Sequence, residues 1–162
     1  MARPWRVPPA LLVLGAAGMV LWSVGCGGEG VTAGATVRVY VGADLCPAAQ
    51  QSLAAANGEA GDVKLQAVCL APAAGGANGR GHLDLAAIGA NARRATQDSS
   101  TIAFVESRGP ANRFARTIVE EAGIAYVIAS SGEDAVQRIL DAVEEAGSGS
   151  LRDEVRQTLE SE

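Results

Sequence analysis

Apolar, strand-like runs alternate with amphipathic helical segments from residue 37 onwards, and this alternation restricts the fold more than any other feature of the chain. Each run is rich in Val, Ile or Ala, and each is followed by apolar residues at helical spacing. Strands that alternate with helices predict a parallel sheet with right-handed crossovers and helices on both of its faces. The expected strands span 37–41, 63–70, 101–105 and 124–129, and the helices between them span 46–56, 83–97 and 110–122.

Two more helices are expected after the last strand. The first follows Ser130 and Ser131, either of which can cap it. The second follows a Gly-Ser linker, and its apolar stripe either packs on its own domain or docks a partner. That stripe consists of Leu151, Val155 and Leu159. We therefore predict one α/β domain over 36–146 with a doubly wound, mainly parallel, four-stranded sheet, and a linker with a C-terminal amphipathic helix over 147–162.

The N-terminal segment has the order of an export signal. Arg3 and Arg6 precede an apolar run over 10–22, and small residues and then Cys26 follow that run. A cysteine in this place resembles a bacterial lipoprotein signal, in which it becomes the lipidated first residue of the mature chain. A cleaved secretory signal and an uncleaved anchor are the alternatives, although the run is shorter than the ~20 residues of a membrane span. The expected segments are a signal peptide over 1–25 and a flexible tether over 26–35.

Lipidation at Cys26 predicts that the domain is held on the extracytoplasmic face of the cell membrane. The chain carries 18 acidic and 13 basic residues, for a formal net charge of −5. Loss of Arg3 and Arg6 with the signal peptide makes the mature chain more negative still. Because an acidic surface repels polyanions, we expect no nucleic acid partner.

Cys46 and Cys69 are the cysteines of the mature domain besides Cys26. Disulfides persist outside the cytoplasm, and an even pair of cysteines predicts one bridge. Cys46 follows the first expected strand and Cys69 ends the second, so the two lie close together if these strands are neighbours. Two buried free thiols are the alternative.

The candidate ligand site lies where the strands end. Ligands of open parallel sheets bind outside the carboxyl ends of the strands, near the switch in strand order. If the order is 2-1-3-4, the loops after the first and third strands flank that switch. Small hydroxyls and helix amides there suit the carboxylate of an amino acid, although capping alone explains the two serines after the fourth strand. The predicted ligand-binding residues are Asp44, Ser107, Asn112, Ser130 and Ser131.

Nothing in the sequence predicts an enzyme. Asp44 and Glu106 could form a carboxylate pair, but no nucleophile elbow, histidine partner or zinc set accompanies them. His82 is the only histidine, and the glycine-rich stretch over 75–81 lacks the lysine and hydroxyl of a phosphate loop. We therefore expect no catalytic residue, no metal and no cofactor.

Two short motifs carry a resemblance to a known family. The turn at 120–124 (Glu-Glu-Ala-Gly-Ile) and the loop at 129–132 (Ala-Ser-Ser-Gly) lie on either side of the last expected strand. The segment at 58–70 (GEAGDVKLQAVCL) contains the second expected strand. Over 37–146 the chain resembles the N-terminal lobe of type 1 periplasmic solute-binding proteins of the branched-chain amino acid class. With its ANARRAT helix and SGSLRD tail, the whole chain resembles short actinobacterial lipoproteins.

The resemblance implies a solute-binding lipoprotein for amino acids or similar small polar ligands, served by the permease of an ABC-type uptake system. Members of that family close two lobes around the ligand, whereas this chain has one. A second copy of the chain in a homodimer could take the place of the missing lobe and cover the other side of the ligand. The alternative function is a cell-surface interaction or structural module that binds no ligand and whose partner is another envelope protein.

Overall fold

The structure is a computed structural model that describes residues 34–73, 83–146 and 150–161. The elements in these residues are β1 (Thr36–Val41), α1 (Cys46–Ala55), β2 (Glu59–Ala60), β3 (Val63–Cys69), α2 (Leu85–Gln97), β4 (Thr101–Ser107), α3 (Asn112–Glu121), β5 (Ala125–Ala129), α4 (Gly132–Glu145) and α5 (Leu151–Ser161). The expected signal peptide, Cys26, most of the tether, the glycine-rich stretch 75–81 and His82 lie outside the described residues. No helix within the described ranges has the length and apolar character needed to cross a membrane.

The strands form one five-stranded sheet in the order β2-β3-β1-β4-β5. β3, β1, β4 and β5 are parallel, so the four expected strands and their 2-1-3-4 order are confirmed. The sheet has five strands rather than the expected four, because β2 adds to its edge. It is a mixed sheet, since β2 pairs antiparallel with the start of β3. β2 is only two residues long, and it forms because Asn57 and Gly58 adopt positive φ angles of 56° and 65° that reverse the chain after α1.

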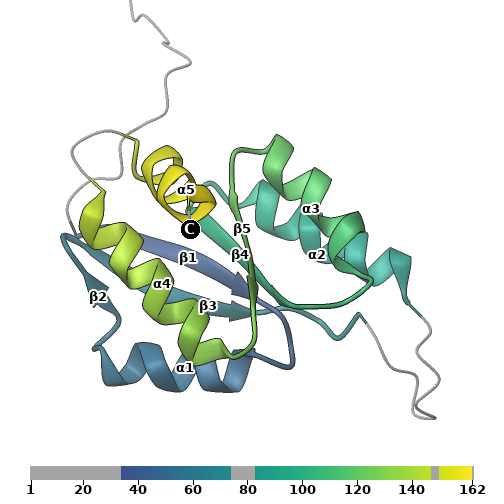
Figure 1. Cartoon of the computed structure of the whole chain (residues 1–162), viewed down its shortest axis with the longest axis horizontal. Coiled ribbons are helices and arrows are strands. Elements are labelled where there is room, and N and C mark those ends of the chain that lie inside the picture. Colours follow the sequence, from purple (N-terminus) through teal and green to yellow (C-terminus); the bar gives the residue numbers. More distant parts are fainter. Residues whose placement is uncertain (1–33, 74–82, 147–149, 162) are drawn as a thin grey trace, which may run out of the picture.

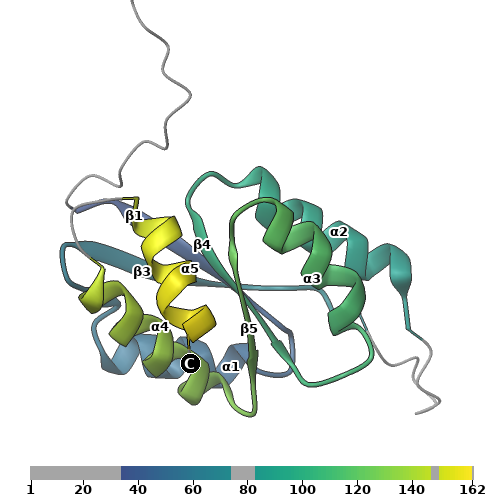
Figure 2. The ribbon, with the colours of Figure 1, turned by 45° about the horizontal axis from the view of Figure 1, so that its top comes forward.

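Helices cover both faces of the sheet, as the sequence predicts (Figures 1 and 2). α1, α4 and α5 pack on one face, while α2 and α3 pack on the other. Alternate residues of β1 enter the two cores: Val39 faces the first set of helices and Tyr40 faces the second. Thr101 to Val105 of β4 are all buried, which explains why this strand has an apolar run rather than an alternating pattern.

The C-terminal helix packs on its own domain. Leu151, Val155 and Leu159 are buried and belong to the core shared by β1, α1 and α4. α5 lies against β4 and β5, and Arg152 donates a hydrogen bond to the carbonyl of Ser99 at 2.6 Å. Of the two interpretations of this stripe, packing on its own domain is confirmed and docking of a partner is wrong.

Gly132 lets α4 begin directly against the start of α1. A Cβ atom at this position would overlap the carbonyl oxygen of Leu45 and lie 2.5 Å from the backbone nitrogen of Ala49. Both neighbours are backbone atoms, which cannot rotate away as a side chain can. The close approach of the two helices therefore requires glycine here.

Candidate functional site

A cleft of about 470 Å³ lies at the carboxyl end of the sheet, bordered by the segments that follow β1, β3 and β4. β1 lies between β3, which follows it in the sequence, and β4, which follows β3. The strand order therefore reverses between β1 and β4, and the cleft lies at this switch. The lining groups on which its chemistry depends are Asp44, Asn91, Glu106, Ser107, Arg108 and Asn112.

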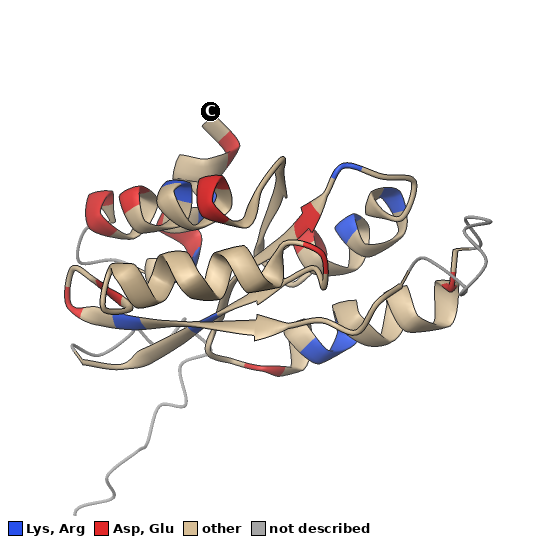
Figure 3. Ribbon diagram, turned by 90° about the horizontal axis from the view of Figure 1, so that it is seen from below, with Lys and Arg blue, Asp and Glu red and all other residues tan. Residues whose placement is uncertain are grey.

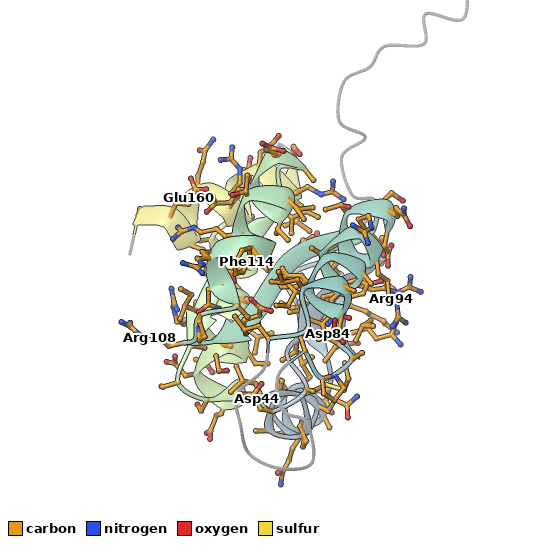
Figure 4. The ribbon with its side chains drawn as sticks, turned by 90° about the vertical axis from the view of Figure 1, so that its right-hand side faces the viewer. Asp44, Asp84, Arg94, Arg108, Phe114 and Glu160 are labelled. Atoms are coloured by element: carbon orange, nitrogen blue, oxygen red, sulfur yellow. A yellow bond between two sulfur atoms is a disulfide. The ribbon has the colours of Figure 1, made fainter. Side chains whose placement is uncertain are left out.

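Asp44 and Arg108 are residues of opposite charge on loops that line this cleft. Both side chains are exposed, one in the loop before α1 and the other in the loop after β4. Figure 4 shows both in the lower half of the view, with the Arg108 side chain pointing away from the ribbon. Among the described residues, neither side chain has a hydrogen-bond or ion-pair partner. Gly42 leaves room for the carboxylate, because a Cβ at Gly42 would lie 3.1 Å from Asp44 Oδ1.

Glu106 is held at the end of β4 by two polar neighbours. The hydroxyl of Tyr126 donates to Glu106 Oε2 at 2.5 Å, and Asn112 Nδ2 donates to the same oxygen at 3.2 Å. Both bonds reach Oε2, and the other carboxylate oxygen has no hydrogen-bond partner among the described residues. Glu106 is therefore held in one orientation at the end of β4, and groups held in advance bind a ligand at a lower entropic cost.

Tyr126 is suited to this supporting role. Burial raises the pKa of its phenol far above the ordinary value, and the hydrogen bond to Glu106 raises it further. The ring also stacks on Phe104, with centroids 5.9 Å apart and an angle of 15° between the planes. A phenol that stays protonated and whose ring stacks on Phe104 is a stable hydrogen-bond donor to the Glu106 carboxylate.

Asn112 is also engaged inside the protein. It is 8% exposed, and its Oδ1 accepts a hydrogen bond from the Gly109 backbone N–H at 2.6 Å. Its Nδ2 donates to the carbonyl of Ser107 at 3.0 Å in addition to Glu106. The side chain shapes the loop after β4 and positions Glu106, although the sequence predicts that it binds ligand directly.

The structure separates the predicted serines into two groups. Ser107 lines the cleft beside Asp44. Ser131 caps α4, because its Oγ accepts a hydrogen bond from Asp134 N at 3.1 Å. Neither Ser130 nor Ser131 lines the cleft, since they follow β5 at the edge of the sheet, one strand away from the switch in strand order.

Asn91 forms part of a cleft wall that the sequence does not predict. Its Nδ2 donates to the carbonyl of Ala71 at 2.8 Å, and its Oδ1 accepts from the Ala71 N–H at 3.3 Å. This pair of bonds fixes the segment after β3 against α2. A buried asparagine between Ile88 and Ala92 on an otherwise apolar helix face is the signal that could have identified it.

The predicted disulfide is present at the same end of the sheet. Cys46 and Cys69 are bonded, with Cα atoms 5.5 Å apart. The bond joins the first turn of α1 to the last residue of β3, so it ties together two of the segments beside the cleft. A bridge across a loop of this length stabilises a domain by about 3 kcal/mol.

Comparison of the chain with family models, curated proteins and solved structures finds no match. The resemblance to periplasmic solute-binding proteins therefore stays a prediction. The basis for assigning a function is the geometry of the cleft.

Proposed function

We propose that this chain is a membrane-tethered, extracytoplasmic solute-binding lipoprotein whose cleft binds a small zwitterion such as an amino acid. One observation carries the proposal: groups of opposite charge without partners among the described residues surround a single cleft at the switch in strand order. Charged side chains that line a cleft and have no partner within the fold can bind a ligand of opposite charge without breaking an internal bond.

The charges of the cleft divide between the two ends of such a ligand. Asp44 and the free oxygen of Glu106 suit an ammonium group, and Arg108 suits a carboxylate by rotating inward from its exposed loop. Hydrogen bonds between charged groups are about twice as strong as neutral ones. Leu70, Pro72 and Leu83 add an apolar part to the wall, which suits a short aliphatic side chain.

The size of the cleft also supports a small ligand. A volume of about 470 Å³ lies within the range of roughly 300–1,000 Å³ that is usual for small-molecule sites. One lobe encloses a solute from one side only, so part of the ligand's surface stays in water. We expect binding to be weak and to require a second wall, from a permease or another copy of the chain, before it becomes tight.

A ligand screen on the purified full-length chain tests the proposal. Amino acids should raise its melting temperature, because a ligand that binds only the folded state stabilises it. Asp44→Asn and Arg108→Gln should abolish the increase. Asp62→Asn and Arg93→Gln are matched controls, because these residues are exposed and neither lines the cleft. The absence of any increase across the panel would contradict the proposal and favour an interaction module without a ligand.

The membrane tether is tested separately. A bacterial host fed a labelled fatty acid should transfer the label to the chain, and Cys26→Ser should remove it. Cys69→Ser is the control, because Cys69 forms the disulfide with Cys46. Equal labelling of the wild type and Cys26→Ser would contradict lipidation while leaving the ligand-binding proposal intact.

A further inference from the structure

The charges on the wall of the cleft do not balance. Among the described residues that line it, Asp44 and Glu106 are acidic, Arg108 is basic, and the others carry no charge. A neutral amino acid has one ammonium group and one carboxylate. Such a ligand therefore leaves one acidic side chain of the cleft without an opposite charge. A charge that a ligand covers but does not pair loses its hydration and gains no partner.

The hydrogen-bond partners of Glu106 do not neutralise its charge. The hydroxyl of Tyr126 and Nδ2 of Asn112 are both uncharged donors. Basic positions lie nearby on α2 and α3 (Figure 3), but among the residues that the structure describes no arginine forms an ion pair with Glu106. The carboxylate is therefore oriented by polar groups alone.

Arg116 on α3 shows where one of these basic side chains is directed. Its guanidinium lies over the ring of Tyr126, 5.7 Å from the centroid. Its Nε donates a hydrogen bond to Oε1 of Glu120 at 2.6 Å, one turn further along the same helix. The arginine that contacts the ring supporting Glu106 therefore pairs with a different carboxylate. The fold orients Glu106 without pairing its charge.

The two acidic side chains of the cleft are within reach of one small molecule. A Cβ atom at Gly42 would lie 3.1 Å from Oδ1 of Asp44 and 3.7 Å from the Cα of Glu106. Both residues therefore approach a glycine, where the absence of a side chain leaves space beside them. Glu106 directs its carboxylate toward β5 and α3, whereas Asp44 lies in the loop before α1. The cleft thus has one carboxylate on each of two loops.

The apolar part of the wall suits a chain of methylene groups. Leu70, Pro72 and Leu83 form this part. An aliphatic chain that ends in an ammonium group packs its methylenes on apolar surface while the charged end stays with polar groups. A ligand of that shape can use the apolar wall and a second carboxylate together. A neutral aliphatic amino acid can use only the apolar wall.

We propose that the cleft selects a diamino acid, a zwitterion with a second ammonium group at the end of an aliphatic chain, over a neutral amino acid of the same length. This inference rests on the proposed solute-binding function and names the class of solute. The two ammonium groups balance Asp44 and Glu106, and the carboxylate pairs with Arg108. Glu106 is then a specificity-determining residue, because without it the charges of the cleft match a neutral amino acid.

Calorimetric titration of the purified full-length chain with lysine and with α-aminoheptanoic acid tests the proposal. The second ligand has a methyl group in place of the side-chain ammonium of lysine. Lysine should bind at least about tenfold more tightly. Glu106→Gln keeps an acceptor for the Tyr126 hydroxyl and should reduce this ratio to about one. Glu121→Gln is the matched control, because Glu121 is exposed on α3 and does not line the cleft, and it should keep the wild-type ratio. Circular dichroism verifies that both variants fold.

Two more compounds separate a diamino acid from other cations. Cadaverine, which is lysine without its carboxylate, should bind more weakly than lysine because Arg108 then faces only positive charge. Calcium chloride should not displace lysine, since no three metal-ligating side chains come together among the described residues. Equal affinities for lysine and α-aminoheptanoic acid, an unchanged ratio in Glu106→Gln, tighter binding of cadaverine, or displacement by calcium would overturn this inference and leave the solute-binding proposal standing. Binding of no amino acid at all would contradict both.

Discussion

Asp98 at the amino end of the sheet and the charged residues Asp44 and Arg108 at the carboxyl end differ in their hydrogen-bond partners. At the amino end, Asp98 accepts hydrogen bonds from Arg38 Nη1 at 2.8 Å, from the Tyr40 hydroxyl at 2.9 Å and from the Ser100 hydroxyl at 2.6 Å. At the carboxyl end, Asp44 and Arg108 have no such partners among the described residues. Satisfied polar groups stabilise a fold, while unsatisfied ones are available to a ligand. The Asp98 cluster therefore stabilises the fold, and ligand binding at the carboxyl end is the function that we propose.

The largest expected effect comes from backbone packing at the carboxyl end of the sheet. Gly132→Ala should lower the free energy of unfolding by more than about 3 kcal/mol, because its Cβ would overlap backbone atoms of α1. Gly109→Ala is the control, since a Cβ there meets no atom within 4 Å. Urea denaturation measures both. Equal stabilities would mean that α1 and α4 can separate without cost.

The disulfide should have the next largest effect. Reduction of the Cys46–Cys69 bond, or the double change Cys46→Ser and Cys69→Ser, should cost about 3 kcal/mol because the unfolded chain gains conformational freedom. Chemical denaturation with and without reductant measures the difference. A reduced protein as stable as the oxidised one would show that the bond adds nothing to the fold.

At the stabilising end, Asp98→Ala should cost about 2 kcal/mol, since it leaves several donors without their acceptor. Burial alone would raise the pKa of Asp98, but the bonds from Ser100, Arg38 and Tyr40 lower it below its ordinary value. The stability from this carboxylate is therefore complete above about pH 4 and is lost as the pH falls further. Acid titrations of the wild type and Asp98→Ala should converge at low pH, and parallel curves would contradict this account.

Tyr126→Phe should have a smaller effect, about 1 kcal/mol at neutral pH, because the hydroxyl no longer donates to Glu106 or accepts from Asn112 Nδ2. Burial raises the pKa of Tyr126 above that of the unfolded chain, with the bond to Glu106 adding to the shift. The stability from this phenol is therefore complete below about pH 10 and is lost as the pH rises further. Thermal unfolding at alkaline pH should show less pH dependence in Tyr126→Phe than in the wild type.

Removing the unpaired charges should have the smallest effect on stability. Asp44→Asn and Arg108→Gln should each change the free energy of unfolding by less than about 0.5 kcal/mol, because neither side chain has an internal partner to lose. Urea denaturation without added ligand measures this. A loss as large as that of Asp98→Ala would show that the two ends do not differ.

The sheet could be predicted from the sequence because its strands are buried on both faces and its helices have regular spacing. β2 could not, since two residues carry no periodic pattern and depend on the turn at Asn57 and Gly58. The strand-end rule selects Asp44, Ser107 and Asn112, which line the cleft, and their binding of a ligand stays a prediction. It also selects Ser130 and Ser131, which follow the edge strand. It omits Arg108 and Asn91, whose places depend on how their loops and helices pack.

The central claim is that the carboxyl end of the sheet binds a small zwitterion, and an NMR titration of the labelled full-length chain with amino acids tests it most directly. The account predicts that amide signals shift at Gly42–Asp44 and Glu106–Asn112 and that those at Arg38, Asp98 and Ser100 stay in place. Shifts centred on the Arg38 and Asp98 cluster, or no shifts with any amino acid, would contradict it.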